Sequence, residues 1–109
     1  MSTNKIMLVQ GDTAPSIVVA LADQATGLPV NIAGATVLLK FRALGATTLA
    51  DTITGNVTDG AGGKVTFNWS STSLSGPPGP YEGEVEITFA DGKVQTLQKP
   101  LKFSMRAQF

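Results

Sequence analysis

Three glutamates at alternate positions, Glu82, Glu84 and Glu86, are the residues of this sequence best spaced to act together chemically. In an extended strand, alternate side chains share one face and lie about 7 Å apart. Two such carboxyl groups could act as an acid and base pair on a glycosidic bond, or supply oxygen ligands to calcium. We favour the alternative, a charge-balanced and solvated strand face, because no pocket-forming element surrounds the segment and Lys99 is expected opposite Glu84.

The chain contains neither histidine nor cysteine. This excludes Ser-His-Asp and Cys-His catalysis, histidine-ligated metals, zinc-thiolate sites and disulfides. The Gly-rich stretch at residues 59–63 lacks the alternating oxygen ligands of a calcium loop, and it precedes a strand rather than the helix of a phosphate-binding loop. We therefore assign no catalytic, metal-binding or cofactor-binding residue. We expect no enzymatic activity, no cofactor and no small-molecule substrate.

Trp69 and Tyr81 are the aromatic residues best suited to stack against a sugar ring. However, Trp69 lies at alternate positions with Val65 and Phe67 along one predicted strand, which predicts that all three side chains face one core. Tyr81 stands at the start of a predicted strand, where its ring would be buried and its hydroxyl would reach a loop backbone. The sequence thus favours structural roles for both.

The composition of the chain limits the remaining classes of function and partner. The 109 residues suit one domain, residues 1–109, and the equal numbers of acidic and basic residues provide no net charge to attract nucleic acid or an anionic membrane. Charged residues make up 15% of the chain, below the usual quarter or so, which indicates surface that a partner covers. No apolar run has the length of a signal peptide or a membrane span, so we expect synthesis in the cytoplasm without an export signal.

Apolar residues alternate with polar ones and fall on odd numbers, which predicts strands with one buried face. Residues 81–89 are the clearest case, and Asp91-Gly92 after them predicts a two-residue hairpin. That turn would pair Phe89 with Val94, Thr88 with Gln95 and Glu84 with Lys99. Pro100 should end the returning strand, because proline cannot donate to a ladder.

The remaining predicted strands follow the same pattern, with a weaker one suggested by Leu49 and Ile53. They lie near residues 5–9, 17–21, 37–41, 65–69 and 101–106. Seven or eight short strands without an amphipathic helix predict an all-β fold, and a two-sheet antiparallel β-sandwich is favoured over a barrel.

The order of several motifs resembles the N-terminal domain family of phage baseplate upper proteins and related small immunoglobulin-like domains of tailed-phage tails. The resemblance covers about residues 4–106. It rests on Gln10-Gly11-Asp12-Thr13, the segment 28–37 (LPVNIAGATV), Gly63-Lys64-Val65-Thr66-Phe67, and the segment 79–92 (GPYEGEVEITFADG). Gly79-Pro80-Tyr81 departs mildly from the Gly-Thr-Tyr usual in the family, and the long downstream regions of baseplate upper proteins are not part of this sequence.

This resemblance implies an immunoglobulin-like sandwich that acts as a structural protein of a phage or prophage tail or baseplate, located in the virion. Its partners would be other tail or baseplate proteins, or further copies of itself. The alternative is an immunoglobulin-like ligand-binding or adhesive module, for example one that binds a glycan. Free strand edges and the segment from Met105 to Phe109 are the expected partner contacts, with Phe109 either inserted into a neighbour or frayed.

Overall fold

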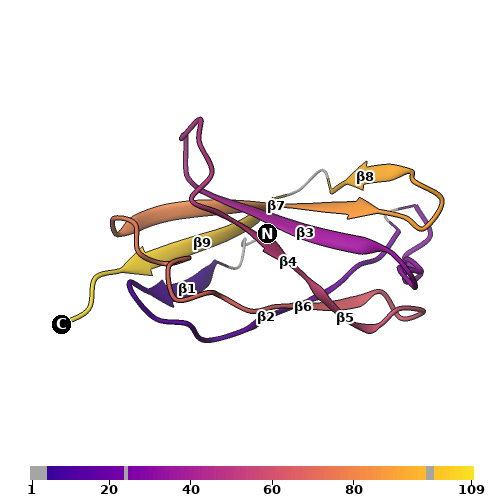
Figure 1. Ribbon diagram of the computed structural model, residues 1–109, viewed down its shortest axis with the longest axis horizontal. Coiled ribbons are helices and arrows are strands. Elements are labelled where there is room, and N and C mark those ends of the chain that lie inside the picture. Colours follow the sequence, from indigo (N-terminus) through magenta and orange to yellow (C-terminus); the bar gives the residue numbers. More distant parts are fainter. Residues whose placement is uncertain (1–4, 24, 98–99) are drawn as a thin grey trace.

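The computed structural model describes residues 5–23, 25–97 and 100–109, which contain nine strands and no helix (Figure 1). The strands are β1 (Ile6–Val9), β2 (Ile17–Ala20), β3 (Thr36–Ala43), β4 (Asp51–Thr54), β5 (Asn56–Asp59), β6 (Lys64–Phe67), β7 (Gly79–Thr88), β8 (Val94–Thr96) and β9 (Leu101–Arg106). Accordingly, the described residues include no helix long and apolar enough to cross a membrane.

The strands form two sheets that face each other, as the upper and lower layers of Figure 1 show. The larger sheet has the order β1-β9-β7-β3-β4, with β8 also paired to β7, and the smaller has the order β2-β6-β5. β1 runs parallel to β9, whereas the other pairs are antiparallel. This connectivity is that of an immunoglobulin-like sandwich, with β2, β5 and β6 in one sheet and β3, β7 and β9 in the other.

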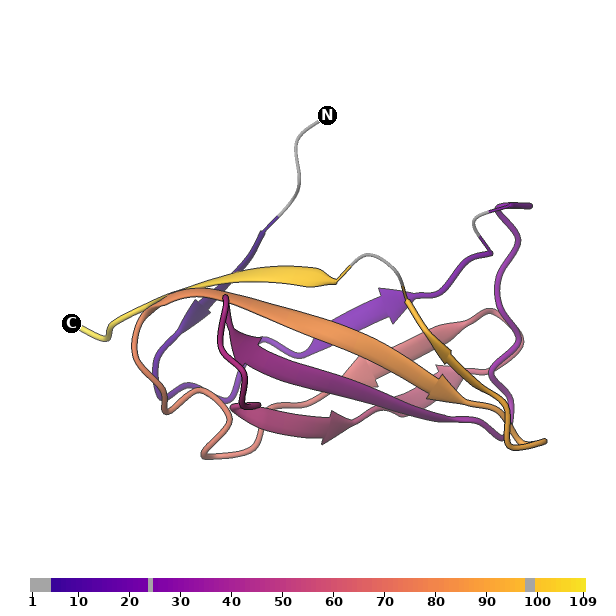
Figure 2. The same ribbon diagram turned by 90° about the horizontal axis from the view of Figure 1, so that it is seen from above.

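β7 is the central strand of the larger sheet. It pairs with β3 along eight residues on one side, and β9 and then β8 follow each other along its other side (Figure 2). Pro100 lies between β8 and β9, outside both strands, as expected for a residue without an amide hydrogen.

The predicted register of the β7–β8 hairpin was wrong by one residue. Thr88 pairs with Val94 and Ile87 with Gln95, and the amide of Phe89 donates to the carbonyl of Lys93 at 2.8 Å. The loop therefore has three residues, 90–92, and ends on Gly92 at φ 91°. A turn followed by a left-handed glycine is the usual three-residue hairpin loop, and Gly92 supplies that glycine here. Lys99, the predicted partner of Glu84, lies outside the described residues.

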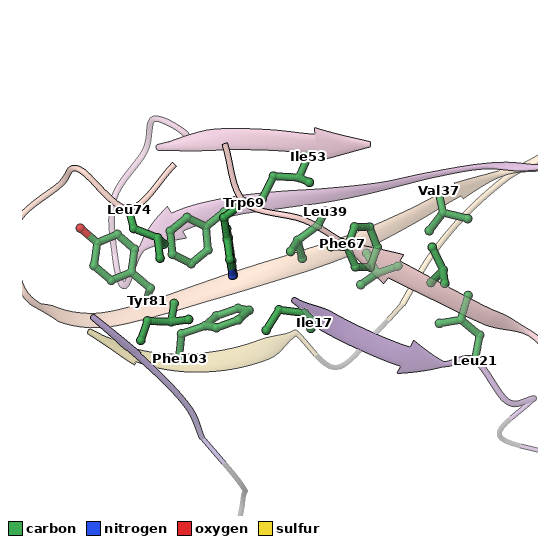
Figure 3. Close-up of a cluster of buried hydrophobic side chains, with 14 of the residues drawn as sticks. Ile17, Leu21, Val37, Leu39, Ile53, Phe67, Trp69, Leu74, Tyr81 and Phe103 are labelled. Atoms are coloured by element: carbon green, nitrogen blue, oxygen red, sulfur yellow. The ribbon is translucent and has the colours of Figure 1, made fainter. Parts of the chain in front are cut away.

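The core fills the space between the sheets (Figure 3). Odd-numbered residues of β3, β6, β7 and β9 face it, as the alternation predicts. β1 is the exception, because Leu8 is buried and Met7 is exposed. Ile32 and Leu74 also reach the core from segments between strands, where no periodicity could indicate their burial.

One strand, β5, was not predicted. The chain leaves β4 in the larger sheet and enters β5 in the smaller sheet through Gly55 alone. A Cβ atom at this position would lie 2.5 Å from Val65 Cγ2 and 2.8 Å from Phe67 Cε1, so only glycine fits where the backbone crosses between the sheets.

Candidate partner-binding surfaces

The glutamate ladder lies on the outer face of the larger sheet, where cations from β3 balance it. Lys40 Nζ lies 2.9 Å from Glu86 Oε2, and Arg42 Nη2 lies 3.2 Å from Glu82 Oε2. The hydrogen bond from Lys40 to Glu86, followed by the charge of that carboxylate, raises the lysine pKa above its ordinary value. The charge-balanced face expected from the sequence is confirmed, with cations supplied by Lys40 and Arg42 of β3.

This outer face has a shallow depression of about 130 Å³. Its walls are formed by Lys40, Arg42, Leu49, Glu82, Glu84 and Pro100. Ligand sites of ordinary size enclose roughly 300–1,000 Å³, so the depression is too small for a sugar or a cofactor. Within the described residues, no three acidic side chains gather closely enough to hold a metal ion.

Both aromatic residues considered as a sugar platform are buried. The Trp69 indole nitrogen donates to the carbonyl oxygen of Pro15 at 2.9 Å, and the ring packs edge-on against Phe41 at 5.0 Å between centroids. Tyr81 stacks on Phe41 at 4.8 Å, and its hydroxyl points out of the cluster toward the loop (Figure 3). Since neither ring face is free, neither can stack against a sugar, and their predicted core positions are confirmed.

Ser73 is the one polar residue that is buried in the described part of the chain. Its hydroxyl donates to the carboxylate of Asp51 and accepts a 2.8 Å hydrogen bond from the backbone amide of Ser70. These contacts fix the turn that carries the buried Leu74. The arrangement stabilises structure, because every partner of the hydroxyl belongs to the turn or to the adjoining strand.

The two residues expected at a partner contact occupy different environments. Met105 is 3% exposed and faces the core, opposite Leu8 in the parallel register of β1 and β9. Phe109 is fully exposed, and the guanidinium of Arg106 lies 4.8 Å from its ring centre. Of this pair, only Phe109 presents its side chain at the surface of the molecule.

A larger surface that the sequence reasoning missed lies along the open side of the sandwich, between β2 in one sheet and β8 and β9 in the other. A groove of about 980 Å³ opens there, and we call it the β2 groove. Its apolar walls include Val19, Leu28 and Val30 on the β2 side, and Ile87, Leu97 and Leu101 on the side of the larger sheet. Asp23 is its one charged lining residue among those described.

The available signal for this surface was the composition of β2. Its four residues, Ile17–Ala20, are all apolar, so the alternation that marks a half-solvated strand fails there. Val18 is 66% exposed and Leu28 is 64% exposed. Apolar side chains on both faces of an edge strand indicate contact with something beyond the strand.

Two comparisons with known proteins add no family to this description: no protein-family model matches the chain, and no curated protein matches it.

Proposed function

We propose that this protein is a non-catalytic structural component of a phage or prophage tail or baseplate, that it is located in the virion, and that it acts by assembling with other tail proteins. The motif order between Gln10 and Gly92 supports the tail assignment by its resemblance to baseplate domains. The immunoglobulin-like sandwich is the fold that this resemblance implies.

The observation that carries the assembly role is the β2 groove. Its apolar walls come from both sheets, and it adjoins a strand that pairs on one side only within the described residues. Such a surface is costly to leave in water, since each Å² of apolar surface removed from solvent stabilises by roughly 25 cal/mol. A protein partner that covered it would gain that stabilisation. The depression beside the glutamates is several times smaller than this groove.

The glycan-binding alternative lacks a specific observation in its favour. The two aromatic residues that would have carried it are both buried in the core. We therefore propose assembly alone.

The test is to follow a tagged copy of the chain in cells that produce the phage or carry the induced prophage. We expect it to sediment with purified particles in a density gradient and to cross-link to tail proteins, as identified by mass spectrometry. A tagged cytoplasmic protein of similar size, expressed in the same cells, controls for trapping in the particle fraction. Recovery of the chain only at the top of the gradient, alongside this control, would overturn the virion assignment.

A further inference from the structure

We infer that the β2 groove accepts an extended, apolar segment of a partner chain, which pairs with the free edge of β2 as an added strand. This inference deepens the proposed assembly role, and it rests on that role only for the identity of the partner.

The backbone of β2 offers unpaired hydrogen-bonding groups along the groove. Leu21 donates its amide hydrogen to the carbonyl of Gly63 at 2.8 Å, in the same register in which Val19 pairs with Val65. In an antiparallel ladder, alternate residues point their N–H and C=O groups to opposite sides. Val18 and Ala20 therefore direct both groups away from β6, toward the edge where no other described strand pairs.

The residues after β2 leave this edge open. The carbonyl of Leu21 accepts from Val30, and the amide of Asp23 donates to the carbonyl of Leu28, both at the side occupied by β6. The hairpin formed by residues 21–30 thus extends the ladder on the β6 side. An incoming strand would meet the outward-directed groups of Val18 and Ala20 at the other side.

The groove determines which side chains an added strand would carry. Ile17 and Val19 turn inward, and across the groove the partly buried Leu97 and Leu101 pack against the core. A strand beside β2 would place every second side chain between these walls, because its side chains alternate between the two faces of the sheet. With Asp23 as the one charged lining residue among those described, the inward positions should be apolar and uncharged.

A segment of a partner suits this edge better than a second copy of the chain. β2 has four residues, so symmetric pairing of two β2 edges would involve few residues on each side. A stable dimer usually buries about 1,200–2,000 Å². An inserted segment is instead held by the β2 backbone along one edge and by apolar residues of both sheets on its inner face, which is the arrangement of strand addition.

The experiment selects binders to the purified protein from a random library of displayed peptides, roughly six to eight residues long, the length of an ordinary strand. Selected peptides should carry apolar residues at alternate positions. Val18→Pro removes one outward amide donor without breaking the β2–β6 ladder, and it should weaken their binding by about tenfold. Val18→Thr keeps the amide and a β-branched side chain, and it is the matched control that should leave binding unchanged.

Leu28→Glu is the second variant, since Leu28 is largely exposed and its replacement leaves the core intact. It should weaken peptide binding by about tenfold as well, because a carboxylate would enter the apolar wall. Peptides without alternation, a failure to select any binder, or binding that neither variant weakens would overturn the inference. Dimerisation that Val18→Pro abolishes would also overturn it, by assigning the edge to a second copy. Peptide binding by a chain that is absent from virions would refute the proposed function alone.

Discussion

The hydroxyl of Tyr81 donates a hydrogen bond to the backbone carbonyl oxygen of Pro77, four residues earlier, at 2.7 Å. It joins the start of β7 to the loop between the two sheets, which is the position of the tyrosine corner in immunoglobulin-like domains. The same ring lies parallel to Phe41 at 4.8 Å, with 7° between their planes. One side chain therefore links the loop, β7 and the aromatic part of the core.

Replacing Tyr81 with phenylalanine should keep the stacked ring and remove only the hydrogen bond. We expect the free energy of unfolding to fall by about 1 kcal/mol, the usual net contribution of such a bond. Urea denaturation followed by the fluorescence of Trp69, the single tryptophan, measures this change. An unchanged unfolding midpoint would mean that water replaces the bond without cost.

The ionisation of Tyr81 should depend on folding. Burial raises the pKa of its phenol above the ordinary tyrosine value of about 10. A raised native pKa means that the folded state binds the proton more tightly, so this contribution to stability is complete below about pH 10 and is lost as the pH rises through the native value. Because the chain has one tyrosine, phenolate absorbance reports this group alone. We expect the absorbance to rise at higher pH in the folded protein than in urea, and coincident curves would contradict the effect of burial.

Gly83 of β7 should not accept even the smallest side chain without a loss of stability. It faces the core, where a Cβ atom would lie 2.7 Å from Leu39 Cδ1 and 3.0 Å from Phe103 Cε2. Gly83→Ala should therefore lower the free energy of unfolding by about 1–3 kcal/mol through overpacking. Glu84→Ala, at the exposed neighbouring position, is the control and should change stability by no more than about 0.5 kcal/mol. Equal effects of the two substitutions in the same urea titration would refute the steric explanation.

The ion pairs on the outer face of the larger sheet should contribute little to stability. Arg42 and Glu82 lie 3.2 Å apart, but the arginine side chain is 42% exposed, so water screens the pair. A double-mutant cycle with Arg42→Met and Glu82→Gln should give a coupling energy below about 1 kcal/mol, and lower still in concentrated salt. A larger coupling energy that salt leaves unchanged would show that the pair is more desolvated than its exposure indicates.

The β7–β8 hairpin and the passage of the chain from β4 to β5 are two local details that the alternation of apolar and polar residues could not predict. The Asp91-Gly92 signal located the turn, but two-residue and three-residue loops accept the same glycine, so the register depended on the paired strands. β5 has one partly buried residue, Val57, so its sequence shows almost no alternation of apolar and polar residues. Its pairing with β6 becomes evident only where Gly55 lets the backbone cross between sheets.

Among the surface candidates, the glutamate ladder and its interpretation as a charge-balanced, solvated strand face could be predicted from the sequence. Charge on alternate residues is a local property of one strand. The ladder's two observed ion pairs are formed with Lys40 and Arg42 of β3, forty or more residues earlier in the chain, and alternation along one strand could not indicate this neighbour. The β2 groove was not predicted because its walls come from segments far apart in the sequence, and the one local sign of it was the apolar composition of β2.

The sequence by itself determined the all-β class, the face of nearly every long strand, the core positions of Trp69 and Tyr81, and the exclusion of histidine and cysteine chemistry. Each of these depends on residue type and on a period of two, which the chain carries locally. The tertiary structure alone decided which strands are neighbours, that β2 keeps one edge unpaired within the described residues, and that an apolar groove opens beside it. The physical reason is that strand pairing joins backbone groups that are identical in every residue, so only the packing of whole sheets can select the partner.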